Sequence, residues 1–427
     1  MKPGDTIKVT LTDTKEVHGI LMPQPELFGE DKIVLKLSSG YNIGVEKKNI
    51  KEIIIEKEYR AEEKKKTALQ QNPDLKKITI LHSGGTIASQ VDYKTGGVVA
   101  KYDPQEFLQL FPELHELVQI DSVMVSQVFS EDMEPEHWKK LAEAVEKEYK
   151  KGAKGIIITH GTDTMHYTSA ALTFMLQNLP IPVLLVGSQR SPDRGSSDAY
   201  QNLLHAVQFI AGTEWIGVGI CMHGSTDDDC SYIHCGTKVK KMHTSRRDTF
   251  TSINTTPLAK VSAGKIDYLR EHSKTVSGKF HVLSKFKKAG LLKAHPGMII
   301  DELKFFADNN YDGLIIEGTG LGHLPVNATD EHTKHHAELL ELLKKMSTSM
   351  VIVMCSQCSY GAVDLDVYAT GRYLAQAGVI SGKDMTSETA YVKLSWLLGN
   401  YTFKQAKEMI SQDIAGEISD RQQYQEL

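Results

Sequence analysis

Two short strings place hydroxyl side chains directly after apolar runs. HSGGTIA (82–88) carries Thr86 behind two glycines, and THGTDTM (159–165) carries Thr162 and Asp163. Glycines let a chain turn sharply and expose backbone N–H groups to a ligand. A threonine hydroxyl can attack a carbonyl carbon when a neighbouring base or a lowered pKa activates it. Each string alone also fits a helix N-cap or a phosphate cradle, although no P-loop or dinucleotide-binding glycine pattern accompanies them.

Both strings end strands of a regular alternation. The apolar runs KITILHS (77–83), GIIITH (155–160), IPVLLVGS (181–188) and GVGICMHG (217–224) alternate with helical patterns such as 135–152. Continuous apolar strands between amphipathic helices indicate a parallel sheet covered on both faces. Open α/β sheets bind ligands at the carboxyl ends of their strands, which is where these hydroxyls lie.

A second α/β domain follows. The alternation stops between about 255 and 295 and resumes with YDGLIIEG (311–318), SMVIVMCSQ (349–357) and helices near 330–346 and 386–399. The predicted organisation has five parts, namely a small β-barrel (1–56), a charged linker (57–75), a first α/β domain (76–255), a connection (256–290) and a second α/β domain (291–427).

The N-terminal part reads differently from the rest. Residues 4–55 contain five short segments rich in Ile, Val and Leu, separated by turn signals and without a helical period. This pattern predicts an all-β barrel of SH3-like or Sm-like size, acting as a docking module or as a structural appendage. The charged run EKEYRAEEKKK (56–66) follows as a linker or a short exposed helix.

Composition excludes several classes of protein. The chain has 427 residues, of which 41% are hydrophobic and 24% charged, and its net charge is −5. These proportions are globular, and the whole-chain charge gives no basic stripe for duplex binding. No apolar run approaches the ~20 residues of a membrane helix, and the start has no signal-peptide pattern. Five thinly spread cysteines favour a reducing, cytoplasmic setting.

Taken together and in this order, the two strings resemble the signature motifs TGGTIA and HGTDTM of the type I and II bacterial L-asparaginases. The resemblance covers roughly residues 76–427. It continues through GSQRSPDRGSSDAYQNLLHAV (187–207), EGTGLGHLP (317–325), CSQCSYGAVDLDVYATG (355–371) and GVISGKDMTSETAYVKLSWLLG (378–399). It implies two asparaginase-like α/β domains and hydrolysis of a side-chain amide through an acyl-threonine intermediate.

The resemblance also implies roles for the polar residues of the strings. Thr86 would be the primary nucleophile, or one of two threonines that acyl transfer requires. Thr162 and Asp163 would form a second group with a lysine. Alignment with the family pattern G-R-x-V-x-K-x-x-T-T-x-x-x-x-F over residues 236–250 selects Lys241. Lys241 would accept a proton or act as a fixed charge, and these alternatives stay open.

Two other lysines compete for this place. Lys238 and Lys240 lie on the same short segment as Lys241. The family pattern leaves them without a role, so we expect both to be surface lysines.

Loop residues would complete the site. Tyr93 resembles the lid tyrosine that approaches the nucleophile, although it could be an ordinary exposed loop residue. Gly85 and Gly161 would line the substrate, with backbone N–H groups near the two threonines as the oxyanion hole.

The segment FSEDMEPEHW (129–138) resembles the part of the family that holds the substrate's α-carboxylate and α-amino groups. Ser130 would bind the carboxylate, and Glu131 would face the ammonium together with Asp163. The same residues could cap the following helix, and both roles can hold at once.

Some features fit the family less closely. His323 stands where many asparaginases have Asn in a stretch that reaches the neighbouring subunit's site, which suggests altered specificity. Cys355 and Cys358 form C-x-x-C inside the asparaginase-like body, so we expect structural cysteines and no metal. The histidines of HTKHH (332–336) are expected on the solvated face of a helix.

A barrel in front of such a body resembles the ammonia-releasing subunits of archaeal tRNA-dependent amidotransferases, which are ligase complexes. This implies a homodimer that takes glutamine or asparagine. A second subunit with ATP, Mg and the tRNA site would convert Glu-tRNA(Gln) to Gln-tRNA(Gln). Nothing in this chain looks like an ATP site, so we expect no cofactor here.

Two other functions stay open. One is a stand-alone cytoplasmic L-asparaginase with an extra N-terminal domain, which only residues 4–55 disfavour. The other is a non-catalytic binding protein with a relic body. The intact set of Thr86, Thr162, Asp163 and Lys241 argues against that relic.

Overall fold

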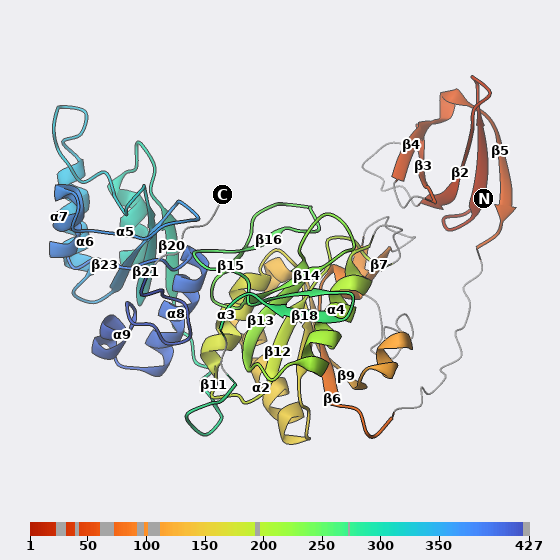
Figure 1. Cartoon of the computed structure of the whole chain (residues 1–427). Helices are drawn as coiled ribbons and strands as arrows, with labels where there is room; N and C mark the ends of the chain where they lie inside the picture. Colours follow the sequence, from red (N-terminus) through yellow and green to blue (C-terminus); the bar gives the residue numbers. More distant parts are fainter. Residues whose placement is uncertain are drawn as a thin grey trace.

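The structure is a computed structural model of the whole chain, and Figure 1 shows its arrangement. The residues that it describes are 1–22, 31–38, 42–59, 72–91, 98–100, 112–192, 197–271 and 274–421.

The N-terminal part is an antiparallel sheet of five strands in the order β4-β3-β2-β1-β5 (Figure 1). Its strands are β1 (Thr6–Leu11), β2 (Glu16–Met22), β3 (Lys32–Lys36), β4 (Asn42–Glu46) and β5 (Ile50–Lys57). Alternate residues point inward, so that Ile7, Val9 and Leu35 are fully buried. The prediction of an all-β N-terminal part is confirmed.

The central part is a mixed sheet of eight strands in the order β18-β17-β14-β13-β12-β10-β6-β9. Its strands are β6 (Lys77–Gly84), β9 (Gln119–Val128), β10 (Ile156–Thr159), β12 (Pro182–Val186), β13 (Gly217–His223), β14 (Ser231–Cys235), β17 (Ala259–Ser262) and β18 (Lys265–Tyr268). The five strands from β13 to β9 run parallel, and the other three continue the edge antiparallel.

Helices cover both faces of this sheet, as the apolar runs predict. They are α2 (Pro135–Lys150), α3 (Met165–Met175) and α4 (Ala199–Gly212). On β10, Ile156 and Ile158 pack in the core of α2 and α3, whereas Ile157 packs in the core of α4. The period of two along a strand explains why the run must be apolar throughout.

The segment predicted only as a connection (256–290) contributes more than expected. β17 and β18 lie in it and extend the edge of the central sheet. They escape prediction because each is four residues long, and β18 has no buried residue.

The C-terminal part is a parallel sheet in the order β20-β21-β22-β23. Its strands are β20 (Ala289–Lys293), β21 (Gly313–Gly318), β22 (Val351–Ser356) and β23 (Ile380–Ser381). Its helices are α5 (Ile300–Asp308), α6 (His336–Met346), α7 (Ala369–Gln376), α8 (Ser387–Asn400) and α9 (Phe403–Met409). The α/β fold class is confirmed. The expected helical face over 332–336 is wrong, because α6 begins only at His336.

Helix α8 joins the two α/β units. It packs on α3 and on β20, β21 and β22, and Trp396 of α8 stacks on Phe174 of α3 with ring centroids 5.5 Å apart. One apolar cluster therefore runs through both units. Two tightly packed units hold their facing loops in fixed positions.

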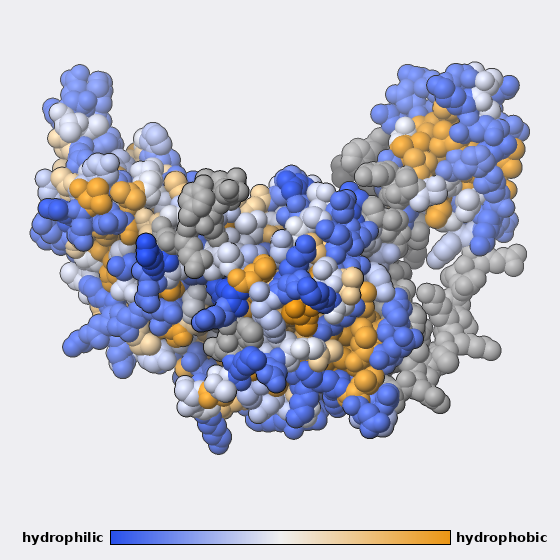
Figure 2. All heavy atoms as spheres, viewed as in Figure 1, coloured by the Kyte–Doolittle hydropathy of each residue, from blue (hydrophilic) through white to orange (hydrophobic). Residues whose placement is uncertain are grey.

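Figure 2 shows one face of the molecule, where apolar side chains gather on the N-terminal sheet and on the first α/β unit between hydrophilic ones. Among the helices in the described ranges, none combines the length and apolarity needed to cross a membrane.

Candidate active site

Two glycines bring the predicted threonine loops into contact. Gly85 has φ +82°, and a Cβ on it would overlap the backbone nitrogen of Gly161. A Cβ on Gly161 would in turn come within 2.8 Å of the Cβ of Ser130. Because no side chain separates these backbones, the segments that carry Thr86, Thr162 and Ser130 meet at one point.

The strand ends that lead into these loops are tied together. β6 and β10 are parallel neighbours, with His82 opposite Thr159. Ser83 Oγ donates to the Thr159 carbonyl over 2.7 Å, and both residues are buried. The carboxyl ends of the two strands are therefore fixed relative to each other just before the turns.

A buried chain of donors fixes the turn before Thr162. Trp138 Nε1 donates to Thr168 Oγ1 (3.0 Å), which lies 2.9 Å from His160 Nε2, and His160 Nδ1 lies 2.7 Å from the Gly161 carbonyl. A carbonyl only accepts, so Nδ1 carries the proton and Nε2 accepts from Thr168. Burial lowers the pKa of His160 to about 4, which agrees with this neutral ring. The turn is therefore locked without adding charge.

Lys241 connects the second threonine to its aspartate. Its Nζ donates to Thr162 Oγ1 over 2.9 Å and to Asp163 Oδ1 over 2.8 Å. The Lys241 side chain is only 9% exposed, whereas that of Asp163 is 66% exposed. Lys241 ends the short strand β15 (Val239–Lys241), which pairs with β16 (Phe250–Ser252). The structure thus brings together the three residues that the family pattern groups.

A polar network supports the other side of Thr162. A Cβ on Gly187 would lie 2.8 Å from the Thr162 methyl group, so this backbone lies directly against it. Asn202 Nδ2 donates to the Gly187 carbonyl over 3.0 Å and to Asp198 over 3.1 Å. Asp198 also accepts from the backbone N–H of Gln189, and burial raises the pKa of its carboxyl group. The sequence analysis assigned no role to Asp198 or Asn202, although both lie in the family-like segment 187–207.

Ser130 lies at the base of the site. It is 3% exposed, and its carbonyl accepts from Thr164 Oγ1 over 2.5 Å. Glu131 is exposed beside it. Ser130–Asp132 form a 3-10 turn, and Glu134 instead caps α2 in a capping box with His137. The alternative that this segment caps the helix is therefore wrong.

The N-cap alternative for the second string is also wrong. The N-cap of α3 is Thr164, and its side chain makes no capping bond. Thr162 and Asp163 come before it and bind Lys241 instead.

The expectation that Lys238 and Lys240 are surface lysines is wrong. Lys238 is buried and pairs with Asp384 over 2.5 Å, and Lys240 pairs with Glu388 over 2.7 Å. Both partners come from the C-terminal part, more than 140 residues away along the chain, so no local pattern could have shown the pairs.

The remaining predicted residues fall into two groups. Thr86 begins the 3-10 turn η3 (Thr86–Ala88) and is half-buried, whereas Tyr93 lies outside the described residues. His323 packs edge-on against Tyr368 at a ring-centroid distance of 5.1 Å, away from the threonines. Cys355 is buried and Cys358 exposed, both as free thiols. In the part of the chain that the structure describes, His, Cys, Asp and Glu form no group of three suited to a metal.

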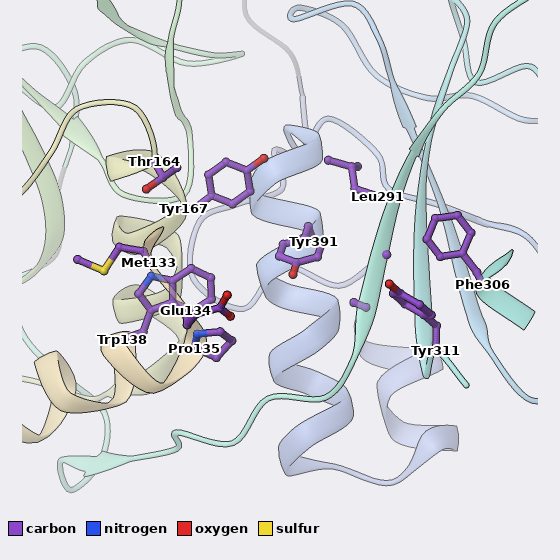
Figure 3. A pocket seen from close by; sticks show the side chains of 12 residues that line it. Met133, Glu134, Pro135, Trp138, Thr164, Tyr167, Leu291, Phe306, Tyr311 and Tyr391 are labelled. Atoms are coloured by element: carbon purple, nitrogen blue, oxygen red, sulfur yellow. The ribbon is translucent and has the colours of Figure 1, made fainter. Parts of the chain in front are cut away.

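A pocket of about 490 Å³ lies next to this site, between the two α/β units (Figure 3). Figure 3 shows Trp138, Thr164 and Tyr167 on one side, Tyr391 from α8 in the middle and Tyr311 beyond it. Neither the two threonines of the predicted chemistry nor Lys241 lines it. The reacting groups therefore belong to the loop junction and not to this pocket.

The geometry supports one kind of chemistry. Two hydroxyls follow adjacent strand ends, and an ammonium group binds one of them and a carboxylate. Such a group can polarise a hydroxyl or exchange a proton with it during attack on an amide carbonyl. Exposed Asp163 and Glu131 can receive the ammonium of an amino-acid substrate.

Comparison with known families divides the chain into three matches. The family described as "Asparaginase, N-terminal" matches residues 77–274, and "Glutaminase/Asparaginase C-terminal domain" matches residues 288–410. "GatD N-terminal domain" matches residues 1–55.

Solved structures of asparaginases are similar to the two α/β units. The thermostable L-asparaginase from Thermococcus kodakarensis is 31% identical with a TM-score of 0.71, covering 81% of this chain and 100% of its own. L-asparaginase I from Vibrio cholerae is 29% identical with a TM-score of 0.70, covering 81% and 99%.

Curated relatives match over nearly the full length. The D-type subunit (GatD) of glutamyl-tRNA(Gln) amidotransferase from Pyrococcus furiosus is 46% identical over 420 residues, which is 97% of this chain and 93% of the relative. The protein of the same name from Methanococcus maripaludis is 43% identical over 98% of this chain and 99% of its own. The chain therefore belongs to the GatD family of glutamyl-tRNA(Gln) amidotransferase subunits.

Proposed function

We propose that this chain hydrolyses the side-chain amide of glutamine or asparagine and supplies the ammonia to a tRNA-dependent amidotransferase. Thr86 attacks the amide carbon and ammonia leaves, so that an acyl-threonine forms. Water then attacks the ester, which releases glutamate or aspartate and restores the hydroxyl. Thr162, Asp163 and Lys241 assist these proton transfers.

The observation that carries this proposal is the junction of Gly85 with Gly161. It places the segment of Thr86 against the segment in which Lys241 binds Thr162 and Asp163. Family membership adds the substrate class, since both curated relatives named above are GatD subunits of glutamyl-tRNA(Gln) amidotransferase.

Around the reacting groups, the proposal assigns binding roles. Ser130 binds the substrate α-carboxylate, and Glu131 with Asp163 binds its ammonium. Gly85 and Gly161 line the substrate, and backbone N–H groups near the threonines form the oxyanion hole. Tyr93 closes over the nucleophile.

The proposal also assigns the partners. A second subunit holds ATP and Mg and uses the ammonia to convert Glu-tRNA(Gln) to Gln-tRNA(Gln), while this chain forms a homodimer without a cofactor. The N-terminal sheet serves as the docking module. Ile54, Ile55 and Tyr59, at or just after β5, are each more than 40% exposed although they are apolar or aromatic. Exposed apolar side chains on a small domain favour contact with another protein.

Ammonia release by the purified full-length chain tests the proposal. L-glutamine and L-asparagine are supplied in parallel, with and without the second subunit, and Thr86→Ala serves as the blank. We expect release that depends on Thr86 and rises when the second subunit is present. No release under any of these conditions would contradict the proposal.

A stand-alone L-asparaginase is the second candidate, because the similar solved structures carry that name and cover 81% of the chain. Rapid turnover of asparagine that stays unchanged when the second subunit is added would favour this function. Turnover that requires the second subunit would exclude it.

A further inference from the structure

Three lysines on one short segment point in two directions. Lys238 precedes β15, and Lys240 and Lys241 belong to it. Side chains alternate along a strand, so Lys238 and Lys240 share one face and Lys241 takes the other. Lys241 reaches Thr162 and Asp163, while the other two reach carboxylates of the C-terminal part.

The two carboxylates lie close together at the start of α8. Asp384 precedes this helix, and Glu388 lies in its first turn. The Lys238 and Asp384 side chains are 4% and 2% exposed, and those of Lys240 and Glu388 are 26% and 10% exposed. Removing one member of a buried pair leaves an uncompensated charge, so each pair strongly favours a single strand position.

The strand itself has little to hold it. β15 and β16 form a separate two-stranded sheet with three residue pairs, and an isolated hairpin of this kind is marginally stable. Its position must therefore come from contacts outside the hairpin.

Further bonds tie both ends of the hairpin to the same region. Before β15, the Thr237 carbonyl accepts from Thr389 Oγ1 over 2.9 Å. After β16, Asn254 Nδ2 donates to the Asp384 carbonyl over 3.0 Å. The start of α8 and the loop before it thus hold the hairpin at both ends and along its middle.

We propose that Asp384 and Glu388 are positioning residues, which align Lys241 with Thr162 by anchoring Lys238 and Lys240. This inference rests on the proposed function for its kinetic consequence. The second α/β unit then takes part in catalysis although it supplies none of the reacting hydroxyls. Any shift of α8 is transmitted along β15 to the Lys241 amine.

The test uses the less buried pair, because its loss endangers folding less. Full-length Glu388→Gln, Lys240→Gln and their double variant are compared with wild type in kcat, KM and thermal unfolding. We expect about a tenfold loss of kcat with KM within about twofold, since misplacement of a catalytic group by about 1 Å can cost up to a hundredfold. The double variant should lose no more than either single variant, because both remove one interaction.

Two matched variants separate positioning from folding. Lys240→Arg keeps the ion pair and should retain kcat within about twofold. Lys287→Gln removes another lysine–carboxylate pair of the C-terminal part, Lys287–Asp312, which does not touch β15, and it should leave kcat unchanged. Unchanged kcat in folded Glu388→Gln and Lys240→Gln would overturn the proposal.

A crystal structure of Glu388→Gln gives a readout that does not depend on activity. We expect the Lys241 Nζ to Thr162 Oγ1 distance to lengthen beyond hydrogen-bonding range from its present 2.9 Å. An unchanged distance would overturn the positioning role. If wild type releases no ammonia, the proposed function fails separately, and this distance alone decides the positioning role.

Discussion

The two α/β units use the carboxyl edges of their parallel sheets differently. In the first unit, β6 and β10 lead into glycine turns that carry Thr86 and Thr162. In the second unit, the end of β21 carries Glu317, whose carboxylate accepts from Ser387 Oγ over 2.5 Å at the start of α8. The first edge presents hydroxyls to a ligand, whereas the second holds a helix.

This difference shows that the sheet does not decide the chemistry. What matters is which residues follow each strand and where their hydrogen bonds go. Gly85 and Gly161 allow two backbones to touch in the first unit. In the second unit, Asp384 and Glu388 hold a strand of the first. One unit would carry the reaction, and the other would set its geometry.

Removing the nucleophile should separate the two units most strongly. For Thr86→Ala we expect kcat for ammonia release to fall at least about 10³-fold with no large change in stability, because the side chain is half-buried and small. Steady-state ammonia release measures this. Thr86→Ser, which keeps a hydroxyl, should retain part of the activity. Wild-type kcat in Thr86→Ala would remove Thr86 from the mechanism.

Replacing the lysine of the first unit should have the next largest effect. Lys241→Met keeps the length of the side chain but removes both bonds, to Thr162 and Asp163. We expect a loss of about 10²–10⁴ in kcat, the range of a positioned proton-transfer group. A kcat within about threefold of wild type would show that Lys241 has no part in the proton transfers.

Breaking the buried pair between the units should act on stability. Asp384→Ala leaves Lys238 buried without its partner, which costs about 3–5 kcal/mol of unfolding free energy. Urea unfolding measures the loss, and Lys238→Met in the same chain should recover part of it. As a matched control, Lys304→Ala at the exposed pair Lys304–Asp301 should leave the unfolding midpoint unchanged. Equal effects at both pairs would contradict the distinction.

The smallest effect should come from acid. Burial lowers the folded pKa of His160 and His166 to about 4, from 6.5. The unfolded state therefore binds protons first, so stability is complete above pH 6.5 and declines as the pH falls toward 4. We expect up to about 1 kcal/mol per histidine to be lost by about pH 6, measured by urea unfolding at about pH 7 and 6. Constant stability over this interval would show that these rings are not held neutral.

Much of the fold follows from local pattern. Uninterrupted apolar strands such as β10 and β12 are buried on both faces, so they could be recognised without any partner. The threonine turns could be recognised because glycine and hydroxyl residues stand directly at strand ends. The contact of Lys241 with Thr162 and Asp163 agrees with the family pattern, and its catalytic role stays a prediction.

The rest depends on contacts that are distant along the chain. Lys238 looks like a surface residue until Asp384, 146 positions later, is brought beside it. Short edge strands such as β18 are stabilised by neighbouring strands and not by their own composition. A single sequence contains the partners but not their pairing.

Covalent labelling of the nucleophile tests the central claim most directly. An electrophilic diazoketone analogue of glutamine is incubated with the full-length chain and its second subunit, and the labelled peptide is identified by mass spectrometry. The account predicts one label on Thr86 that blocks ammonia release and is absent from Thr86→Ala. A blocking label on another residue, or turnover that continues in Thr86→Ala, would contradict it.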